Sequence, residues 1–117
     1  MKYEIINQYT DQEIMNMLYY GTIDELKILS LSVGEYHLDY QFAQDVCFFL
    51  LENSDEGVRA NAILGLSYIA RRYNKLDIKR LRLFLKKQPM FSKENFERVK
   101  YALEDISLFV HENIKLE

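Results

Sequence analysis

The 117-residue sequence predicts an all-α fold, a stack of antiparallel helical hairpins with about six helices. Signals that begin helices recur along the chain, and only short segments separate one predicted helix from the next. No segment alternates polar and apolar residues convincingly over the length of a strand. The four glycines and the single proline also supply few of the turns that a β-sandwich or barrel requires.

The first two helices each begin with a capping box, in which a Thr and a Glu three residues later exchange hydrogen bonds with the backbone. The boxes span Thr10–Glu13 and Thr22–Glu25 and predict helices over 11–19 and 23–33. A third helix, over 40–52, includes the apolar run VCFFLL. The only cysteine of the chain lies in this run, and we expect it to be a buried, reduced thiol.

Polar and acidic residues mark the starts of the last three helices. Ser54 precedes two acids, which suit the positive end of a helix over 55–73. Two further helices are expected over 77–88 and 92–113. Pro89 separates them, because proline cannot continue the preceding helix.

The helix over 55–73 has apolar or small residues on nearly every side. A projection at about 100° per residue groups a core stripe, which consists of Val58, Ala62, Leu66, Ile69 and Tyr73. A second stripe, far round on the other side, consists of Asn61, Leu64, Tyr68 and Arg71. The small residues Ala60 and Gly65 would let neighbouring backbones approach closely. A helix contacted on two sides is predicted to be an interior member of a stack.

The last four predicted helices repeat with a period of about 36 to 37 residues. A shift of 37 residues aligns Gly65 with Ala102, and a shift of 36 residues aligns Phe48 with Phe84. Each unit is then a helix, a tight turn and a second helix. Such units bury their apolar faces only by stacking on their neighbours.

The pattern D-E-x-V-R-x-x-A-x-x-x-L-x-x-I-A, from Asp55 to Ala70, resembles the second helix of a HEAT repeat. In that repeat the Asp-x-x-Val-Arg opening caps and orients the helix, and the Ala and Leu pack between helices. The next unit departs from it, with Asn95 and Phe96 in place of Val-Arg. The resemblance implies a single HEAT-like helical domain over 1–117.

A longer pattern, LGLSYIARRYNKLD (64–77) followed by A-L-x-D-I (102–106), is similar to small bacterial HEAT-like proteins. Some of these are encoded beside polymorphic or contact-dependent growth inhibition toxins and serve as their immunity proteins. The resemblance implies a protein that binds and neutralises a cognate toxin by covering the toxin's active or substrate site.

No catalytic constellation appears in the sequence. His37 and His111 are far apart, and no cysteine cluster joins them at a metal site. His37 lies two residues from Asp39, a contact that is usually structural, and the chain has no phosphate loop or nucleophile motif. We therefore expect a protein that is not an enzyme and has no cofactor and no metal.

No apolar run reaches the roughly 18 to 20 residues of a membrane span, and the first residues contain no apolar signal-peptide core. We expect a cytoplasmic protein with no membrane partner.

The charges are divided unevenly, although the net charge is only −3. Residues 1–57 contain eleven Asp/Glu and two Lys, whereas residues 58–117 contain thirteen Lys/Arg and seven Asp/Glu. Such an asymmetry indicates an interaction surface. The alternative is that the two halves partly neutralise one another across the fold.

Several tyrosines accompany the acids in the first half. Tyrosine brings a large contact area at low rotamer cost, and acids around it would steer a basic partner. The candidate partner-binding residues are Tyr19, Tyr20, Glu35, Tyr36, Asp39 and Tyr40, with Asn61, Tyr68 and Arg71 of the second stripe as a further candidate surface. The alternative is that some of these tyrosines are core residues with only a hydroxyl in solvent.

The predicted partner is a cognate toxin protein of basic character, a class that includes nucleases. Two other functions stay open: nucleic-acid binding through the basic segment 71–87, and a scaffold role within a larger assembly. Against nucleic-acid binding, the 78–87 segment is amphipathic and its charges can simply face solvent. The sequence leaves the oligomeric state open.

Overall fold

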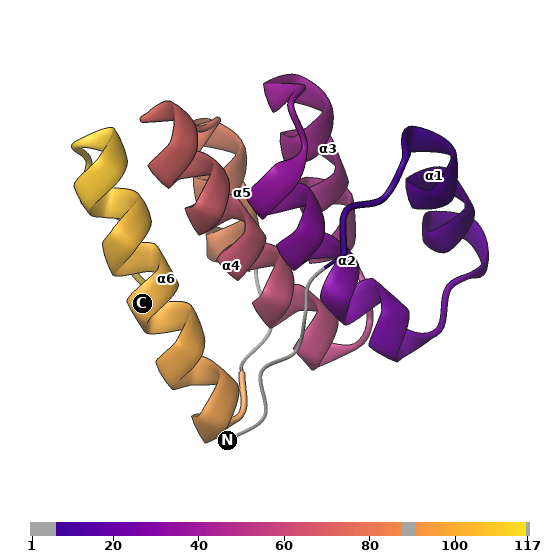
Figure 1. Cartoon of the computed structure of the whole chain (residues 1–117). Coiled ribbons are helices and arrows are strands. Elements are labelled where there is room, and N and C mark those ends of the chain that lie inside the picture. The colour runs from indigo at the N-terminus through magenta and orange to yellow at the C-terminus, as the bar shows by residue number, and fades with distance from the viewer. Residues whose placement is uncertain (1–6, 88–90, 117) are drawn as a thin grey trace, which may run out of the picture.

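The computed structural model describes residues 7–87 and 91–116, and these form six α-helices joined by short connections (Figure 1). The helices are α1 (Asp11–Tyr20), α2 (Ile23–Tyr36), α3 (Tyr40–Leu51), α4 (Glu56–Tyr73), α5 (Ile78–Lys87) and α6 (Lys93–Val110). The predicted all-α fold with six helices is confirmed. Each helix begins within one residue of its predicted start, while α2 ends three residues later and α6 three residues earlier than predicted. Pro89 lies outside the described residues.

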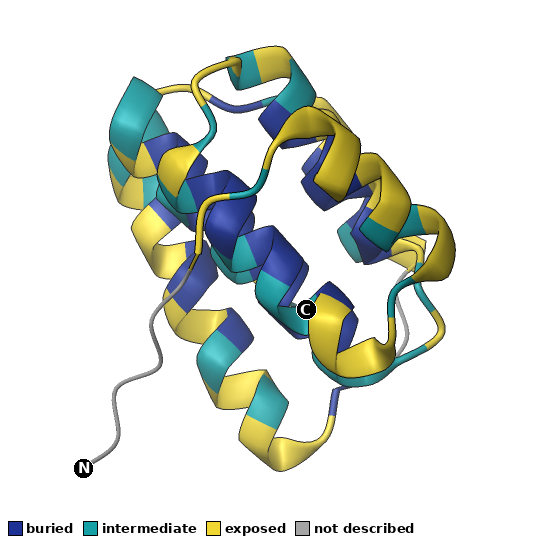
Figure 2. Ribbon diagram, turned by 45° about the vertical axis from the view of Figure 1, so that its right-hand side comes forward, coloured by how far each residue is buried: buried dark blue, intermediate teal, exposed yellow. Residues whose placement is uncertain are grey.

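The helices form two layers (Figure 1). α2, α4 and α6 lie side by side with α4 in the middle, and α3 and α5 lie behind them. Eleven of the eighteen residues of α4 are buried, against one of the ten residues of α1. Buried residues follow the sides of the helices that face the interior, as Figure 2 shows. α4, which contacts α2, α3 and α6, is therefore the interior helix that the sequence predicted.

Both predicted capping boxes are formed. In the first, Thr10 N donates to Glu13 Oε1 over 2.8 Å and Glu13 N donates to Thr10 Oγ1 over 3.1 Å. In the second, the corresponding distances between Thr22 and Glu25 are 2.9 and 3.2 Å. The starts of α1 and α2 are thus determined by side chains within three residues of each other.

The start of α4 is tied to the connection before it. Asp55, rather than Ser54, is the cap residue, and its carboxylate accepts a hydrogen bond from Val58 N over 3.0 Å. Arg59 is buried and donates to the carbonyl oxygens of Asn53 and Ser54 over 3.0 and 2.8 Å. The Asp-x-x-Val-Arg opening therefore both caps and orients α4, as its resemblance to a HEAT repeat implied.

The residues that the shift of 37 residues aligns are buried in both α4 and α6. In α4 they are Ala62, Gly65, Leu66 and Ile69, and in α6 they are Val99, Ala102, Leu103 and Ile106. The repeat in the sequence thus corresponds to a repeated set of packing positions, because α4 and α6 turn these residues toward the interior of the same layer.

α2 and α4 cross in backbone contact at Gly34 and Gly65. A Cβ atom on Gly34 would collide with the carbonyl oxygen of Gly65, and a Cβ atom on Gly65 would lie 2.5 Å from the carbonyl oxygen of Ser30. A backbone atom cannot move aside as the end of a side chain can, so only hydrogen fits at either position. The sequence predicted that this helix ends at residue 33, whereas α2 continues to Tyr36 and Gly34 lies inside it.

Cys47 fills the space behind this crossing. The side chain is fully buried, and its Sγ lies 3.9 Å from the carbonyl oxygen of Ser30. Burial raises the pKa of the Cys47 thiol to about 12, so the thiol is protonated at neutral pH and is a poor nucleophile. The expectation of a buried thiol is confirmed.

Replacing Gly65 with Ala should lower the free energy of unfolding by about 1–3 kcal/mol, because the added methyl group forces two backbones apart. Gly57→Ala is the matched control in the same helix, where the methyl group chiefly meets the flexible end of the Lys27 side chain. The control should be neutral or stabilising, since Ala favours helix over Gly by about 1 kcal/mol. Urea unfolding of both variants measures the difference, and equal stabilities would contradict the close crossing.

Candidate interaction surfaces

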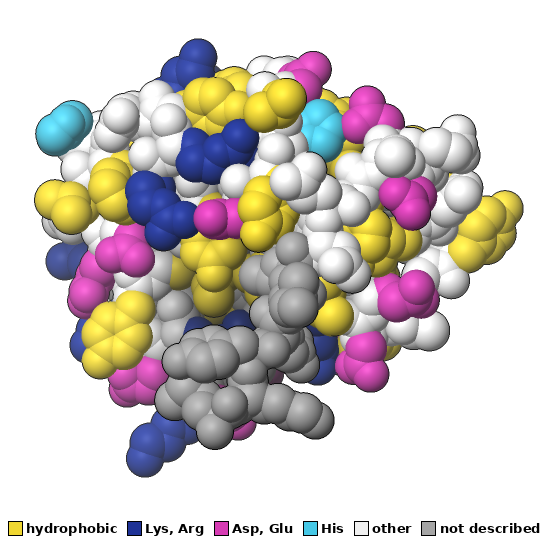
Figure 3. Space-filling model, viewed as in Figure 1, with side chains coloured by type: hydrophobic (Ala, Val, Ile, Leu, Met, Phe, Trp, Pro, Cys, Tyr) yellow, Lys and Arg dark blue, Asp and Glu magenta, His cyan; other side chains and the backbone are white. Residues whose placement is uncertain are grey.

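α1 forms one edge of the stack and buries little of its own surface. Only Ile14 is fully buried, while Tyr19 and Tyr20 are 75% and 85% exposed, with ring centroids 6.3 Å apart. From residue 8 to residue 26 the chain contains four acidic residues and no Lys or Arg. In Figure 3 the side of the molecule over α1 carries Asp, Glu and hydrophobic side chains. The α1 edge therefore presents two tyrosines in acidic surroundings.

A second group of candidate residues meets where α2 lies against α4. Arg71 Nη2 lies 2.9 Å from Glu35 Oε2, and the Arg71 guanidinium carbon lies 5.2 Å from the centre of the Tyr68 ring. Tyr36 follows Glu35 at the end of α2 and is 38% exposed. The structure thus brings Glu35, Tyr68 and Arg71 together across two helices, with Tyr36 beside them toward α1.

Asn61 belongs to the same predicted stripe but is only 8% exposed. Its Nδ2 donates to the carbonyl oxygen of Lys27 over 3.0 Å, and its Oδ1 accepts a hydrogen bond from Arg98. The Asn61 amide therefore links α4 to both α2 and α6. Tyr68 and Arg71 are the members of the stripe that offer polar groups to solvent.

Asp39 and Tyr40 have structural roles at the start of α3. The Asp39 carboxylate accepts a hydrogen bond from the backbone of the first turn over 3.0 Å. Tyr40 packs edge-on against Tyr73, with ring centroids 5.2 Å apart, and Lys75 Nζ lies 4.5 Å from its ring centre. Burial and, to a smaller extent, the charge of Asp77 raise the pKa of Tyr40. A substitution at either candidate residue would thus alter folding as well as any binding surface.

Ion pairs connect the acidic and basic halves of the chain. Three ion pairs join a base of residues 58–117 to an acid of residues 1–57. They are Arg71–Glu35 at 2.9 Å, Arg80–Asp45 at 2.8 Å and Lys87–Glu52 at 3.6 Å. Part of the charge asymmetry of the sequence is therefore compensated across the fold, as the alternative interpretation held. Each exposed pair contributes little stability, typically about 0–1 kcal/mol.

The basic segment 71–87 is largely engaged within the molecule. Besides the three residues already paired, Arg82 lies 3.0 Å from Glu112, and Arg72 donates to the carbonyl oxygens of Gly34 and His37 over 3.0 and 2.8 Å. Nucleic-acid affinity comes from cations that neutralise phosphates and release counterions. Cations already held by carboxylates and carbonyls serve that purpose less well.

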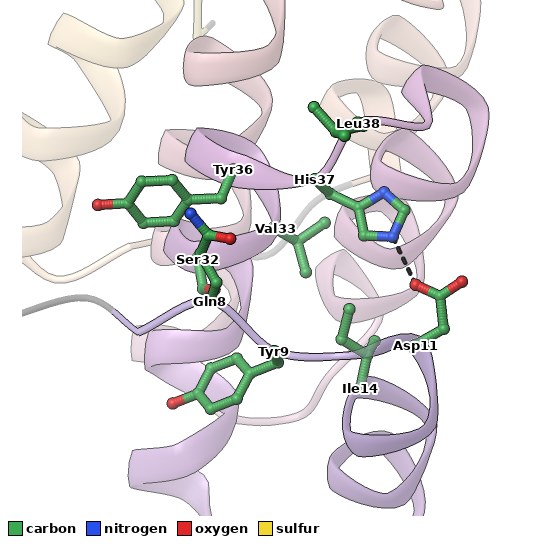
Figure 4. A pocket seen from close by; sticks show the side chains of 9 residues that line it. All are labelled: Gln8, Tyr9, Asp11, Ile14, Ser32, Val33, Tyr36, His37 and Leu38. Atoms are coloured by element: carbon green, nitrogen blue, oxygen red, sulfur yellow. Dashed lines mark hydrogen bonds and ion pairs between the residues drawn. The ribbon is translucent and has the colours of Figure 1, made fainter.

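His37 is fixed by hydrogen bonds to both ring nitrogens. Nδ1 accepts the backbone N–H of Asp39 over 3.1 Å, so Nε2 carries the proton and donates to Asp11 Oδ1 over 2.7 Å (Figure 4). The Asp39 carboxylate is the cap of α3 and not the partner of the imidazole. His111 ends α6 in a left-handed conformation with φ 59°. Within residues 7–87 and 91–116, no group of three His, Cys, Asp or Glu is arranged to hold a metal.

A hollow of about 220 Å³ lies between α1 and the C-terminal end of α2 (Figure 4). Its lining consists of Gln8, Tyr9, Asp11, Ile14, Ser32, Val33, Tyr36, His37 and Leu38. The sequence indicated Tyr36 but not the hollow, because the lining comes from two segments, 8–14 and 32–38, that only the tertiary structure brings together.

The exposed face of α6, at the opposite edge of the stack from α1, was not among the surfaces that the sequence predicted. Tyr101 and Leu108 of α6 are 59% and 68% exposed, and exposed acids accompany them: Glu94, Glu97, Glu104 and Asp105. The seven-residue spacing of Tyr101 and Leu108 puts them on one face of α6, opposite its buried stripe. A helical projection of 93–110 could have identified this face.

Among the residues that the structure describes, no helix is both long enough and apolar enough to cross a membrane.

No protein-family model matches the chain, and no curated protein matches its sequence. The resemblance to a HEAT repeat therefore stays a prediction. Among solved structures, a chain in the crystal structure of a CDI complex from Cupriavidus taiwanensis LMG 19424 is similar, with a TM-score of 0.75 and 22% sequence identity. The match covers 93% of this chain and 97% of that chain. The two chains thus share a fold over almost their whole lengths.

Asp39→Ala should lower the free energy of unfolding by about 1 kcal/mol, because the first turn of α3 loses its side-chain cap. Asp39→Asn keeps an acceptor oxygen and should retain most of that stability. Thermal unfolding of the two variants beside the wild type measures the difference. If Asp39→Ala unfolded at the same temperature as Asp39→Asn, the capping role would be wrong.

Proposed function

We propose that this protein is a cytoplasmic, non-enzymatic immunity protein, a single helical domain that binds a cognate bacterial toxin and neutralises it by covering the toxin's active or substrate site. The observation that carries the proposal is the fold shared with a chain of a CDI complex over 93% of this chain; CDI denotes contact-dependent growth inhibition. The resemblance of the 64–77 segment to immunity proteins of such systems supports the same function.

The α1 edge, together with the adjoining end of α2, is the surface we assign to the toxin. Tyr19 and Tyr20 can contact a partner without leaving any packing position, since most of each side chain is exposed. Tyr36 and Glu35 extend the surface toward α4. Exposed aromatic side chains are the usual anchors of protein interfaces.

A basic toxin suits this surface best. The acids Glu13 and Glu25 cap helices through one carboxylate oxygen each, yet they keep their negative charges in solvent. Asp24 adds a third exposed charge in the first turn of α2. Charges of one sign around exposed aromatics accelerate the encounter with a partner of the opposite sign.

Neutralisation by occlusion also fits the chemical groups of the chain. The imidazole of His37 is held at both nitrogens, and the Cys47 thiol is buried with a raised pKa. Neither is poised for nucleophilic or acid–base work on a substrate, whereas a large rigid surface can block access to one.

The double variant Tyr19→Ala/Tyr20→Ala should weaken toxin binding by about 2 kcal/mol or more, roughly 30-fold in the dissociation constant, because interface tyrosines contribute strongly when buried by a partner. The partner for the measurement is the cognate toxin, and its dissociation rate is followed by a surface-binding assay. Circular dichroism should show unchanged helicity, since neither tyrosine is part of the core.

Tyr101→Ala is the matched control, because Tyr101 is an exposed helical tyrosine at the opposite edge of the stack. It should bind the toxin as the wild type does. If it alone weakened binding, the toxin would dock on α6 and not on α1. If the wild-type protein neither bound the toxin nor protected cells that express it, the immunity function itself would be rejected.

A further inference from the structure

The hollow between α1 and α2 has the size of one side chain. Pockets that hold cofactors or drug-sized ligands usually enclose about 300–1,000 Å³, whereas this one encloses about 220 Å³. It also opens to the surface that we assign to the toxin, since Tyr36 and the exposed Leu38 both belong to its lining. A hollow of this size within an interface serves as a socket for a single anchoring residue of the partner.

The walls of the hollow are largely apolar. In Figure 4 the rings of Tyr9 and Tyr36 lie on one side, and Val33 and Ile14 lie between them and the His37–Asp11 pair. Aromatic faces and aliphatic side chains suit the methylene stem of a long side chain. Aromatic faces also attract a cation that lies over them.

The polar groups around the hollow favour a positive charge. Asp11 uses Oδ1 for the hydrogen bond from His37, and its side chain is 74% exposed, so Oδ2 can accept from another donor. Ser32 Oγ already donates to the carbonyl oxygen of Asn7, over 2.5 Å. The described lining includes no Lys and no Arg.

The helix ends around the hollow contribute little to this preference. The C-terminal end of α2 carries partial negative charge, but Arg72 already donates to the carbonyl oxygens of Gly34 and His37 there. The N-terminal end of α1 carries the opposite partial charge, but Asp11 and Glu13 in its first turn offset it. His37 is a positioning residue here, because its Nε2–H holds the Asp11 carboxylate at the rim of the hollow.

We propose that this hollow receives an arginine side chain of the toxin, with the stem across the rings of Tyr9 and Tyr36 and the guanidinium at Asp11. The inference rests on the proposed function and adds to it the chemistry of the residue that anchors the partner. Arginine suits the site better than lysine, because the planar guanidinium presents several N–H donors in a fixed fork that matches the geometry of a carboxylate.

The socket can be tested without the toxin, using N-acetyl-L-arginine amide as the probe and N-acetyl-L-citrulline amide as its neutral isostere. An NMR titration of the ¹⁵N-labelled protein should show the arginine probe shifting the amide signals of Val33, His37 and Leu38, with a dissociation constant of about 1 mM. The citrulline probe should bind about three- to fivefold more weakly, as expected for one partly exposed charge pair. Equal binding of the two probes, or shifts located elsewhere, would overturn the proposal.

A pair of variants isolates the contribution of Asp11. Asp11→Asn keeps an oxygen that can accept from His37 but removes the charge, so it should abolish the preference for arginine over citrulline. Glu13→Gln removes the same charge from the same turn of α1 and retains the acceptor for Thr10 N, so it should preserve that preference. Loss of the preference in both variants would mean that the general field of α1, and not the socket, selects the cation.

Toxin binding by the same two variants separates this inference from the function itself. Weaker toxin binding by Asp11→Asn than by Glu13→Gln supports the socket. Equal toxin binding by both would show that the toxin does not use the socket, although the protein would still be an immunity protein. Failure of the wild type to bind the toxin would reject the immunity function, whatever the probes show.

Discussion

The backbone contact between α2 and α4 is the constraint on which the rest of the arrangement depends. Because neither Gly34 nor Gly65 has a side chain, the two helices approach until their backbones touch. This separation lets the long side chains of α4 reach the end of α2: Arg71 meets Glu35, and Arg72 meets the carbonyl oxygens of Gly34 and His37. A single added methyl group at the crossing would displace all of these contacts together.

The end of α2 links the interior of the stack to its candidate binding surface. The Tyr73 hydroxyl donates to the carbonyl oxygen of Leu38 over 3.1 Å, so α4 holds the connection between α2 and α3 from two adjacent positions. His37, which lies in that connection, then holds Asp11 at the start of α1. Tyr36 and the neighbouring hollow are thus positioned by a chain of contacts that begins in the core, and a partner would meet a surface already ordered.

The charges of the molecule act in two different ways. Within the layer of α3 and α5, Arg80–Asp45 and Lys87–Glu52 bring basic and acidic segments together and offset part of their charge. At the α1 edge the acids bond mainly to backbone N–H groups at helix starts, which satisfies the hydrogen bonds but leaves the negative charge in solvent. The capping boxes therefore begin two helices and also give the α1 edge a negative charge. A negative surface is the one that would attract a basic toxin.

The sequence by itself determined the helices, because the signals that begin them act within three or four residues. The Thr10 and Thr22 boxes formed as predicted, and the burial of α4 followed from its pattern. Of the candidate surface, the exposed Tyr19 and Tyr20 and the half-exposed Tyr36 could be found in the same way. Only the tertiary structure decided the roles of Gly34, Asn61 and Tyr40, since each depends on atoms of a helix distant in sequence. The hollow between α1 and α2 likewise exists only because His37 and Asp11, 26 residues apart, are brought within 2.7 Å of one another, and no local pattern encodes such a contact.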